Sequence, residues 1–314
     1  MYDIPILVLA FNRPAETQEV FERIRTIRPK YLFVCVDGAR TDKAGEARQC
    51  KAVQNIFLQQ TDWNCSLQTL FRERNLGCRA SVSQAIDWFF GEVEYGIILE
   101  DDCVPELSFF AYCEELLKKY KDEHRIMQVA GYNPLPYALS LKESYFFSRQ
   151  NMGIGWASWR RAWTSMDVDM KGFPAYFSDK KRPLYVNHKK ADAYLMKKFK
   201  ETYEKKNSSW GYAWAFSMFL NGGLSILPKV NLIKNIGIGD MATNTKNTVG
   251  YFLNTKTQEI DLPMNHPSVR VVDENRELDI FFHTQKTRKG LWVQTLFPEP
   301  VRKLGRKIQT VLKF

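Results

Sequence analysis

The sequence predicts an α/β protein built on a mostly parallel sheet flanked by helices, and three observations support this. Short apolar runs such as Ile4–Ala10 and Tyr31–Val36 have the unbroken hydrophobicity of strands that are covered on both faces. Segments with apolar residues at helical spacing alternate with these runs, as right-handed crossovers between parallel strands require. Hydrophobic residues make up 45% of the 314 residues, which excludes a disordered chain and allows a sizeable core.

The expected elements of the first half follow one another as strand and helix. After Ile4–Ala10, a helix opens at Pro14 and ends before Pro29. Strand Tyr31–Val36 follows and stops at an Asp-Gly pair. The next expected elements are a helix, a strand, a helix, a strand and a helix, over residues 46–58, 66–71, 80–90, 97–99 and the segment after Pro105.

The second half has a different composition. Trp156, Trp159 and Trp163 are spaced to fall on one helical face, which is usual for a core helix. A basic helix is expected within residues 187–206, and a strand pair over residues 224–227 and 230–233. No apolar run reaches the ~20 residues that span a bilayer, and no signal peptide is expected.

Cysteine and histidine usage excludes a zinc site of the usual spacing. The six cysteines all fall within the first 113 residues without a CxxC pair, and there are only four histidines. We expect reduced thiols, as in a cytosolic protein.

The net charge of +10 is concentrated in two segments. Residues 171–206 hold eleven Lys or Arg and four acidic residues, and residues 284–314 hold eight and one. The rest of the chain is slightly acidic, which disfavours a uniformly basic nucleic-acid-binding protein. Val301–Phe314 is expected to form a basic amphipathic helix that lies on a membrane surface, or else packs on its own domain. Residues 171–206 are expected to face a membrane or phosphates, or to be a solvated helix face.

Polar residues follow each expected strand of the first half. The strand ends are Asn12-Arg13, Asp37-Gly38, Arg74-Asn75 and Glu100-Asp101-Asp102. Ligands of parallel sheets bind outside the carboxyl ends of the strands, so these residues are candidates for one site. The absence of a GxGxxG segment after the first strand and of a GxxxxGK[ST] segment argues against a dinucleotide-binding dehydrogenase and a P-loop NTPase.

The acidic triplet Glu100-Asp101-Asp102 predicts a divalent cation. Three adjacent carboxylates repel one another and need a compensating positive charge. Mg²⁺ or Mn²⁺ takes one or two carboxylates together with phosphate oxygens, which is an arrangement for a nucleoside diphosphate. The alternative is an acidic turn that caps the following helix.

Several segments resemble the nucleotide-sugar domain of GT-A glycosyltransferases. These are IPILVLAFNRP at residues 4–14, Asp37-Gly38, and IILEDDCVPELSFF at residues 97–110. The sequence is most similar to N-acetylglucosaminyltransferase I and to bacterial nucleotide-diphospho-sugar transferases. GIGWASWRRAW and WGYAWAFSMFLNGGLSILPKVNLIKNIGIGDMATNT extend the resemblance to about residue 250.

The resemblance implies a domain organisation. It predicts a GT-A glycosyltransferase domain over residues 1–250, with a donor half of about 1–130 and an acceptor half of about 131–250. Residues 251–314 would be a C-terminal extension ending in the basic amphipathic helix.

The resemblance also implies residue roles. Asp102 would bind Mn²⁺ or Mg²⁺, and the remaining donor contacts would come from Arg13, Asp37, Arg79, Glu100 and Asp101. Acceptor contacts would come from Trp156, Trp210 and Tyr212.

One position departs from the bacterial pattern. Gly211 stands where an Asp acts as general base in inverting relatives. Asp240 is the leading substitute, and Asp167 and Asp169 are weaker candidates.

The sequence thus leads to three functional hypotheses. The first is a metal-dependent, inverting hexosyl- or N-acetylhexosaminyltransferase using a UDP-linked donor. Its acceptor would be a glycan or lipid-linked glycan in bacterial surface polysaccharide or lipopolysaccharide synthesis, with the enzyme cytoplasmic and peripheral on the inner membrane face. The second, motivated by Gly211, is a sugar-nucleotide-binding pseudoenzyme. The third is a basic nucleic-acid-binding protein.

Overall fold

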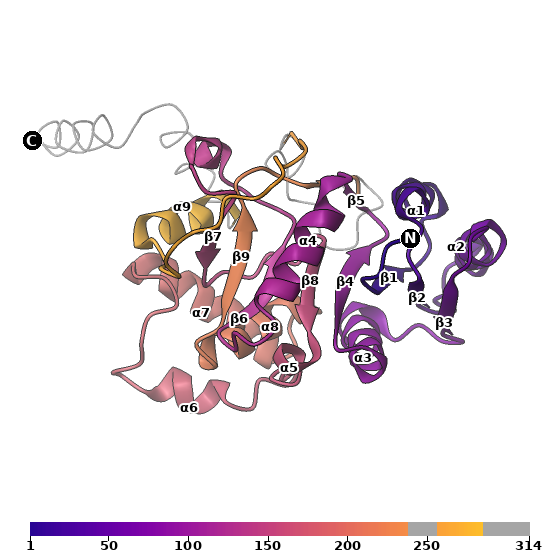
Figure 1. Cartoon of the computed structure of the whole chain (residues 1–314). Coiled ribbons are helices and arrows are strands. Elements are labelled where there is room, and N and C mark those ends of the chain that lie inside the picture. The colour runs from indigo at the N-terminus through magenta and orange to yellow at the C-terminus, as the bar shows by residue number, and fades with distance from the viewer. Residues whose placement is uncertain (238–255, 285–314) are drawn as a thin grey trace, which may run out of the picture.

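The computed structural model describes residues 1–237 and 256–284. A central sheet of eight strands has the order β3-β2-β1-β4-β8-β6-β9-β7, and β10 and β5 form a small second sheet (Figure 1). The strands are β1 Ile6–Ala10, β2 Tyr31–Val36, β3 Ser66–Phe71, β4 Tyr95–Glu100, β5 Cys103–Pro105, β6 Ile126–Ala130, β7 Tyr145–Ser148, β8 Trp156–Trp159, β9 Leu224–Pro228 and β10 Ile233–Asn235.

Helices cover both faces of this sheet. They are α1 Pro14–Ile27, α2 Glu46–Gln60, α3 Gly77–Glu92, α4 Ser108–Lys119, α5 Arg160–Trp163, α6 Phe173–Ser178, α7 Lys189–Tyr203, α8 Trp210–Leu220 and α9 Glu274–Thr284, with a 3-10 helix at Pro136–Ser140. Figure 1 shows α1 and α2 above β1–β3 and α3 below them. None of the helices in the described ranges is long and apolar enough to cross a membrane.

Alternation along the strands creates the two main cores. In β1, Ile6 and Val8 pack with α1, α2 and α4, whereas Leu7 and Leu9 pack with α3 and α8 on the other face. A third cluster joins α6, α7, α8 and α9 beyond the sheet. The α/β class predicted from the sequence is confirmed, and β1–β4 are all parallel to their neighbours within that group.

The tryptophan segment is a strand, so the helical prediction for Trp156 and Trp159 is wrong. Residues 156–159 form β8, which pairs antiparallel with both β4 and β6. In a strand, residues three apart point to opposite faces. Accordingly, Trp156 belongs to one main core and Trp159 to the other. Only Trp163 lies in a helix, the short α5.

The two strands predicted over residues 224–227 and 230–233 do not pair with each other. β9 pairs with β6 and β7 in the central sheet, whereas β10 pairs with β5 in the small sheet. Asn231 lies between them, and its amide donates to the Ile233 carbonyl at 2.9 Å. The two segments are therefore consecutive strands of different sheets. Pairing with β5 places Asn235 at the end of β10 opposite Cys103, the residue that follows the acidic triplet.

Helix α9 is attached to the sheet through a buried glutamate. Glu277 is 1% exposed and accepts a hydrogen bond from the Arg149 backbone N–H at 3.3 Å, just after β7. Gln150 donates from its side chain to the Glu277 carbonyl at 2.6 Å. Burial raises the pKa of Glu277 to about 7, although Ser148 and Arg149 oppose that shift.

We expect Glu277→Gln to reduce the pH dependence of stability. A carboxyl group whose pKa is raised on folding stabilises the protein below its unfolded pKa and loses that contribution as pH rises through the folded value. The loss in the wild type therefore falls between pH 4.5 and about 7 and is on the order of 3 kcal/mol or less. Urea denaturation at pH 5 and pH 8 measures it. Glu274→Gln is the control, since Glu274 is exposed and contacts the same Arg149; an equal effect of both variants would contradict the prediction.

Candidate functional site

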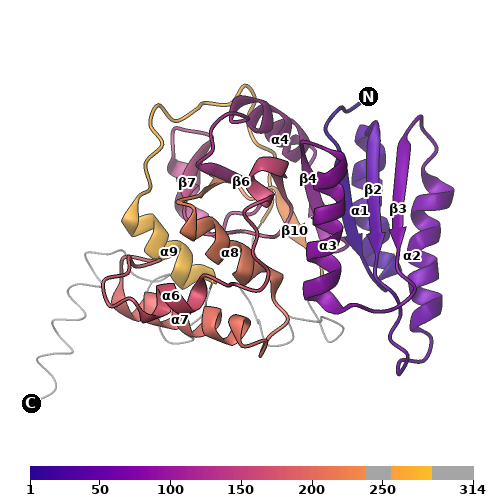
Figure 2. The ribbon, with the colours of Figure 1, turned by 90° about the horizontal axis from the view of Figure 1, so that it is seen from below.

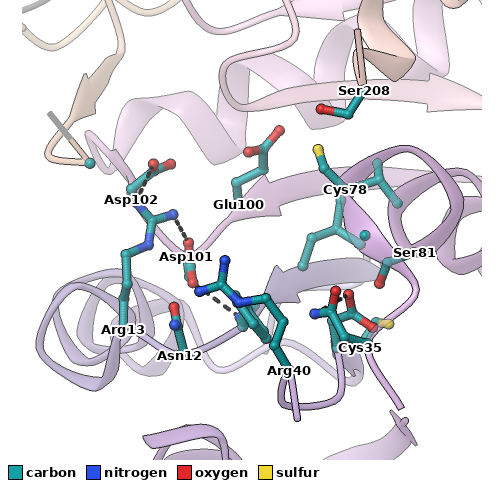
Figure 3. A pocket seen from close by; sticks show the side chains of 18 of the residues that line it. Asn12, Arg13, Cys35, Arg40, Cys78, Ser81, Glu100, Asp101, Asp102 and Ser208 are labelled. Carbon is teal, nitrogen blue, oxygen red and sulfur yellow. Dashed lines mark hydrogen bonds and ion pairs between the residues drawn. The ribbon is translucent and has the colours of Figure 1, made fainter. Parts of the chain in front are cut away.

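The loops after β1 and β4 open a crevice at the point where the strand order reverses. From β1 the chain proceeds to β2 and β3 on one side, and then crosses to β4 on the other side of β1. Ligands of open α/β sheets bind at such a switch point, outside the carboxyl ends of the strands. A pocket of about 460 Å³ lies there (Figure 3). Its lining includes five of the predicted donor-site or metal residues, namely Arg13, Asp37, Glu100, Asp101 and Asp102.

Arg13 joins the first loop to the acidic triplet. It precedes α1, and its guanidinium forms ion pairs with Asp101 and, at 2.9 Å, with Asp102 (Figure 3). Asp101 also accepts a hydrogen bond from the Phe11 backbone N–H at 3.2 Å. Register places these groups together, because Leu9 of β1 lies opposite Glu100 of β4. The structure thus brings together residues almost ninety positions apart in the sequence.

The pocket carries an excess of negative charge. Burial raises the pKa of Glu100 to about 8, helped by Asp102 and Asp101, and raises that of Asp101 to about 6. Arg13 opposes both shifts. Burial lowers the pKa of Arg13 itself, but the two aspartates outweigh it, so its pKa lies above the usual value. Arg13 is the cation that contacts the triplet among the described residues, because Arg40, which also lines the pocket, pairs with Glu46. A bound cation would relieve the remaining repulsion between the carboxyl groups.

The acidic triplet does not cap the next helix. Strand β5 follows it, and α4 begins only at Ser108. The backbone N–H groups of Leu107, just before α4, and of Ser108, its first residue, donate to the Glu259 carboxylate at 3.1 and 2.7 Å. A residue from a distant segment therefore caps α4, and the triplet remains available to the pocket.

Asp37 holds two pocket loops together. Its carboxylate accepts hydrogen bonds from the backbone N–H groups of Gly38 and Leu76, at 3.0 and 3.1 Å, and from the Asn75 amide at 3.1 Å. Gly38 packs so closely on the Arg74 backbone that an added Cβ would lie 2.4 Å from it. Asp37 therefore lines the pocket and at the same time fixes the loop after β2 to the loop after β3.

Arg79 lies elsewhere, so the structure does not bring it into the donor pocket. Its guanidinium donates to the Thr202 carbonyl at 3.0 Å and to the Val168 carbonyl. Both acceptors are in the second half of the chain. Arg79 thus connects α3 to the end of α7. Its place in the sequence, near the start of α3, suggested a donor contact but could not reveal these carbonyl partners.

The predicted acceptor residues lie largely in the core. Trp156 and Trp210 are 1% and 6% exposed and stack on each other, with ring centroids 5.8 Å apart. Their ring faces are therefore covered and are not open to an acceptor sugar in this structure. Tyr212 is half-buried on the first turn of α8 and packs against Phe199.

The candidate bases are placed as follows. Gly211 lies in the first turn of α8, and its carbonyl accepts a hydrogen bond from Asn151 at 3.0 Å. A Cβ added there would make only ordinary contacts of 3.7 Å, with Asn151 and Ser209. Asp167 accepts hydrogen bonds from the backbone of Asp169 and Lys171 and shapes a local turn. Asp240 lies outside the described residues.

Several pocket residues were not predicted. They come from the loop before α2, from the first turns of α3, from the loop before α8 and from the end of β10: Arg40, Cys78, Ser81, Ser208, Asn235 and Gly237. Gly237 lies against the acidic triplet, since a Cβ there would lie 1.9 Å from an Asp102 oxygen. Its place in a Gly-rich turn was the one sequence signal for it.

Three solved structures to which this chain is similar match it only weakly. HddC from Yersinia pseudotuberculosis matches at 11% identity and a TM-score of 0.28, over 47% of this chain and 60% of that chain. A cytidylyltransferase from Leptospira borgpetersenii matches at 10% and 0.32, over 53% and 64%. Mouse xyloside xylosyltransferase 1 matches at 10% and 0.34, over 69% and 81%. The chain therefore spans less than two thirds of the first two proteins, and similarity this low assigns neither a family nor a function.

No protein-family model matches the chain, and no curated protein matches it in sequence. Within residues 1–237 and 256–284, no three His, Cys, Asp or Glu side chains converge as a ready-made metal site.

Proposed function

We propose that this protein is a metal-dependent glycosyltransferase of the GT-A type, which transfers a sugar from a nucleotide donor, UDP-linked, to a glycan or lipid-linked glycan acceptor. One observation carries the proposal: the acidic triplet and Arg13 meet at the switch point of the sheet and line one pocket. Inversion and a role in bacterial surface polysaccharide or lipopolysaccharide synthesis follow from the sequence resemblance alone.

The residues of the proposed donor site have different roles. Asp102 would hold Mn²⁺ or Mg²⁺ through a carboxylate that already lines the pocket, and donor phosphates would supply further oxygens. When bound, the cation stabilises negative charge on the departing diphosphate. Arg13 keeps Asp101 and Asp102 in place, Glu100 projects into the pocket on the side away from Arg13 (Figure 3), and Asp37 holds the wall formed by the β2 and β3 loops.

Two variants test which residue, if any, acts as the general base. If Asp240 removes the acceptor proton, Asp240→Asn should lower transfer by at least about 10²-fold, and Gly211→Asp should leave transfer unchanged. If the protein is a pseudoenzyme that lacks a base at position 211, wild-type transfer should be absent and Gly211→Asp should create it, since a Cβ at this position makes only ordinary contacts. The assay monitors release of the nucleoside diphosphate from a panel of nucleotide sugars, with and without acceptor. It reports sugar transfer and donor hydrolysis for the wild type and both variants.

We also propose that the protein binds the inner face of the cell membrane through the helix expected at Val301–Phe314, which lies outside the described residues. A cationic amphipathic helix gains affinity from anionic lipid and from its apolar face. Deletion of residues 301–314 should lower flotation of the protein with anionic vesicles. Unchanged flotation would contradict this assignment of the helix.

A further inference from the structure

Helix α7 presents a row of lysines on one face. Lys189, Lys190, Lys197 and Lys200 fall within about 100° of arc on a helix that turns ~100° per residue, and all four are exposed. We call these four residues the lysine face. The opposite side of α7 packs on α6, α8 and α9 through Ala191, Leu195, Met196 and Phe199. Packing of the buried side therefore sets the direction in which the lysine face of the helix points.

Three of these lysines have no acidic partner in the described residues. Only Lys200 contacts a carboxylate, that of Glu204 at 3.8 Å, whereas Lys189, Lys190 and Lys197 form no ion pair there. The acidic residue buried in the same helix, Asp192, is already paired with Arg182 at 2.5 Å. Among the residues that the structure describes, the lysine face therefore keeps a net positive charge, with Glu201 near Lys197 and Glu204 near Lys200 as its acidic neighbours.

An exposed aromatic side chain lies beside the lysine face, and an exposed leucine lies in the loop that leads into α7. Phe177 of α6 is 45% exposed, and the Lys200 ammonium lies 5.8 Å from its ring centre. Leu184 is 36% exposed in the loop between α6 and α7. Arg182 and the Tyr185 backbone N–H both bond to Asp192, which fastens that loop to α7. Exposed Lys180 and Lys181 are in the same loop.

We propose that the lysine face, with Phe177 and Leu184, is a second membrane-binding surface that contacts anionic lipid headgroups. Unpaired lysines supply attraction to the headgroups, and an exposed aromatic and an exposed aliphatic side chain can enter the interface between them. A nucleic acid would use the lysines but gain little from an exposed leucine. The proposal does not depend on the glycosyltransferase assignment.

The position of this surface gives it a consequence for the pocket. Figures 1 and 2 show α6 and α7 in the part of the molecule that lies away from β2 and β3. The chain leaves α7 through Lys205 and Lys206 and reaches Ser208, which lines the pocket. Arg79 ties the end of α7 to α3. If the proposed function holds, the membrane-binding surface would therefore be continuous in the chain with one rim of the donor pocket.

Vesicle flotation of the full chain tests the proposal. One variant replaces Lys189, Lys190, Lys197 and Lys200 by Gln, and a matched control replaces Lys43, Lys51, Lys119 and Lys121 by Gln, which are exposed on other parts of the molecule. Both lower the net charge equally. Each lysine near an anionic surface contributes roughly a fivefold factor to binding. We expect the lysine-face variant to lose at least about tenfold in partitioning onto phosphatidylcholine vesicles containing phosphatidylglycerol, and the control to lose much less.

A second variant separates lipid from other anions. Phe177→Ala with Leu184→Ala should lower vesicle partitioning by several-fold and leave any binding to duplex DNA or RNA unchanged. Equal losses in the lysine-face variant and its control would overturn the proposal, because net charge alone would then explain binding. Wild-type binding to nucleic acid without binding to anionic vesicles would also overturn it. Nucleotide binding, measured in parallel, should be the same in all these proteins, so failure of the donor site is seen separately.

Discussion

Asp102→Asn should abolish metal-dependent nucleotide binding while leaving the fold intact. The Asn side chain keeps an oxygen that can accept from Arg13, whose contact with Asp102 is 2.9 Å in the wild type. It removes the negative charge that a divalent cation requires, and neutral amides are weaker ligands for such ions than carboxylates. Because a catalytic cation supplies several kcal/mol of stabilisation to the leaving group, we expect sugar transfer to fall by at least about 10²-fold.

Calorimetry with UDP, with and without Mn²⁺, measures the binding directly. The matched control is Asp62→Asn, which removes one negative charge from an exposed pair with Arg25 on the surface. Undiminished Mn²⁺-dependent binding by Asp102→Asn would remove the metal role from this residue. Absence of nucleotide binding in the wild type would contradict both the glycosyltransferase and the pseudoenzyme.

The strand ends could be predicted from the sequence because parallel strands align their carboxyl ends. Ile4–Ala10 and the residues before Glu100 are unbroken apolar runs, so their ends are marked clearly by the first charged residues. The position of Arg13, Asp37 and the acidic triplet at one pocket follows from that alignment. The sequence could not indicate which carboxylate Arg13 would contact, since this depends on the register of β1 and β4.

The second half was harder to predict because its elements pack in ways that local periodicity does not determine. Trp156 and Trp159 have helical spacing but lie in a strand buried between β4 and β6, where pairing with both neighbours outweighs the local pattern. Arg79 was assigned to the donor site from its place in the sequence, yet its partners are carbonyl groups of Val168 and Thr202. Backbone acceptors carry no signature in the sequence, and such contacts are visible only in the folded chain.

Arg13→Met should destabilise the protein most at high pH, because it removes the only cation that contacts Asp101 and Asp102 among the described residues. Breaking a buried ion pair by removing one partner costs about 3 kcal/mol or more, since the other charge stays buried. Arg13 lowers the pKa of both Glu100 and Asp101, so its removal raises these values further above those of the unfolded chain. Carboxyl groups with raised pKa values stabilise the folded state at low pH and lose that contribution as pH rises. The deficit of the variant should therefore be small near pH 4 and largest above pH 8.

Urea denaturation of the wild type and Arg13→Met across that pH range measures the effect. Arg25→Met is the control, because Arg25 forms an exposed pair with Asp62, and such pairs contribute about 1 kcal/mol or less. A deficit of Arg13→Met that does not change with pH would show that lost packing, rather than uncompensated carboxylates, causes it.

The same variant tests the pocket as a cation site. If the triplet attracts a divalent ion, Mn²⁺ should stabilise Arg13→Met more than the wild type, since the ion would replace the missing positive charge. Equal stabilisation of both proteins would mean that Arg13 and the ion do not share these carboxylates.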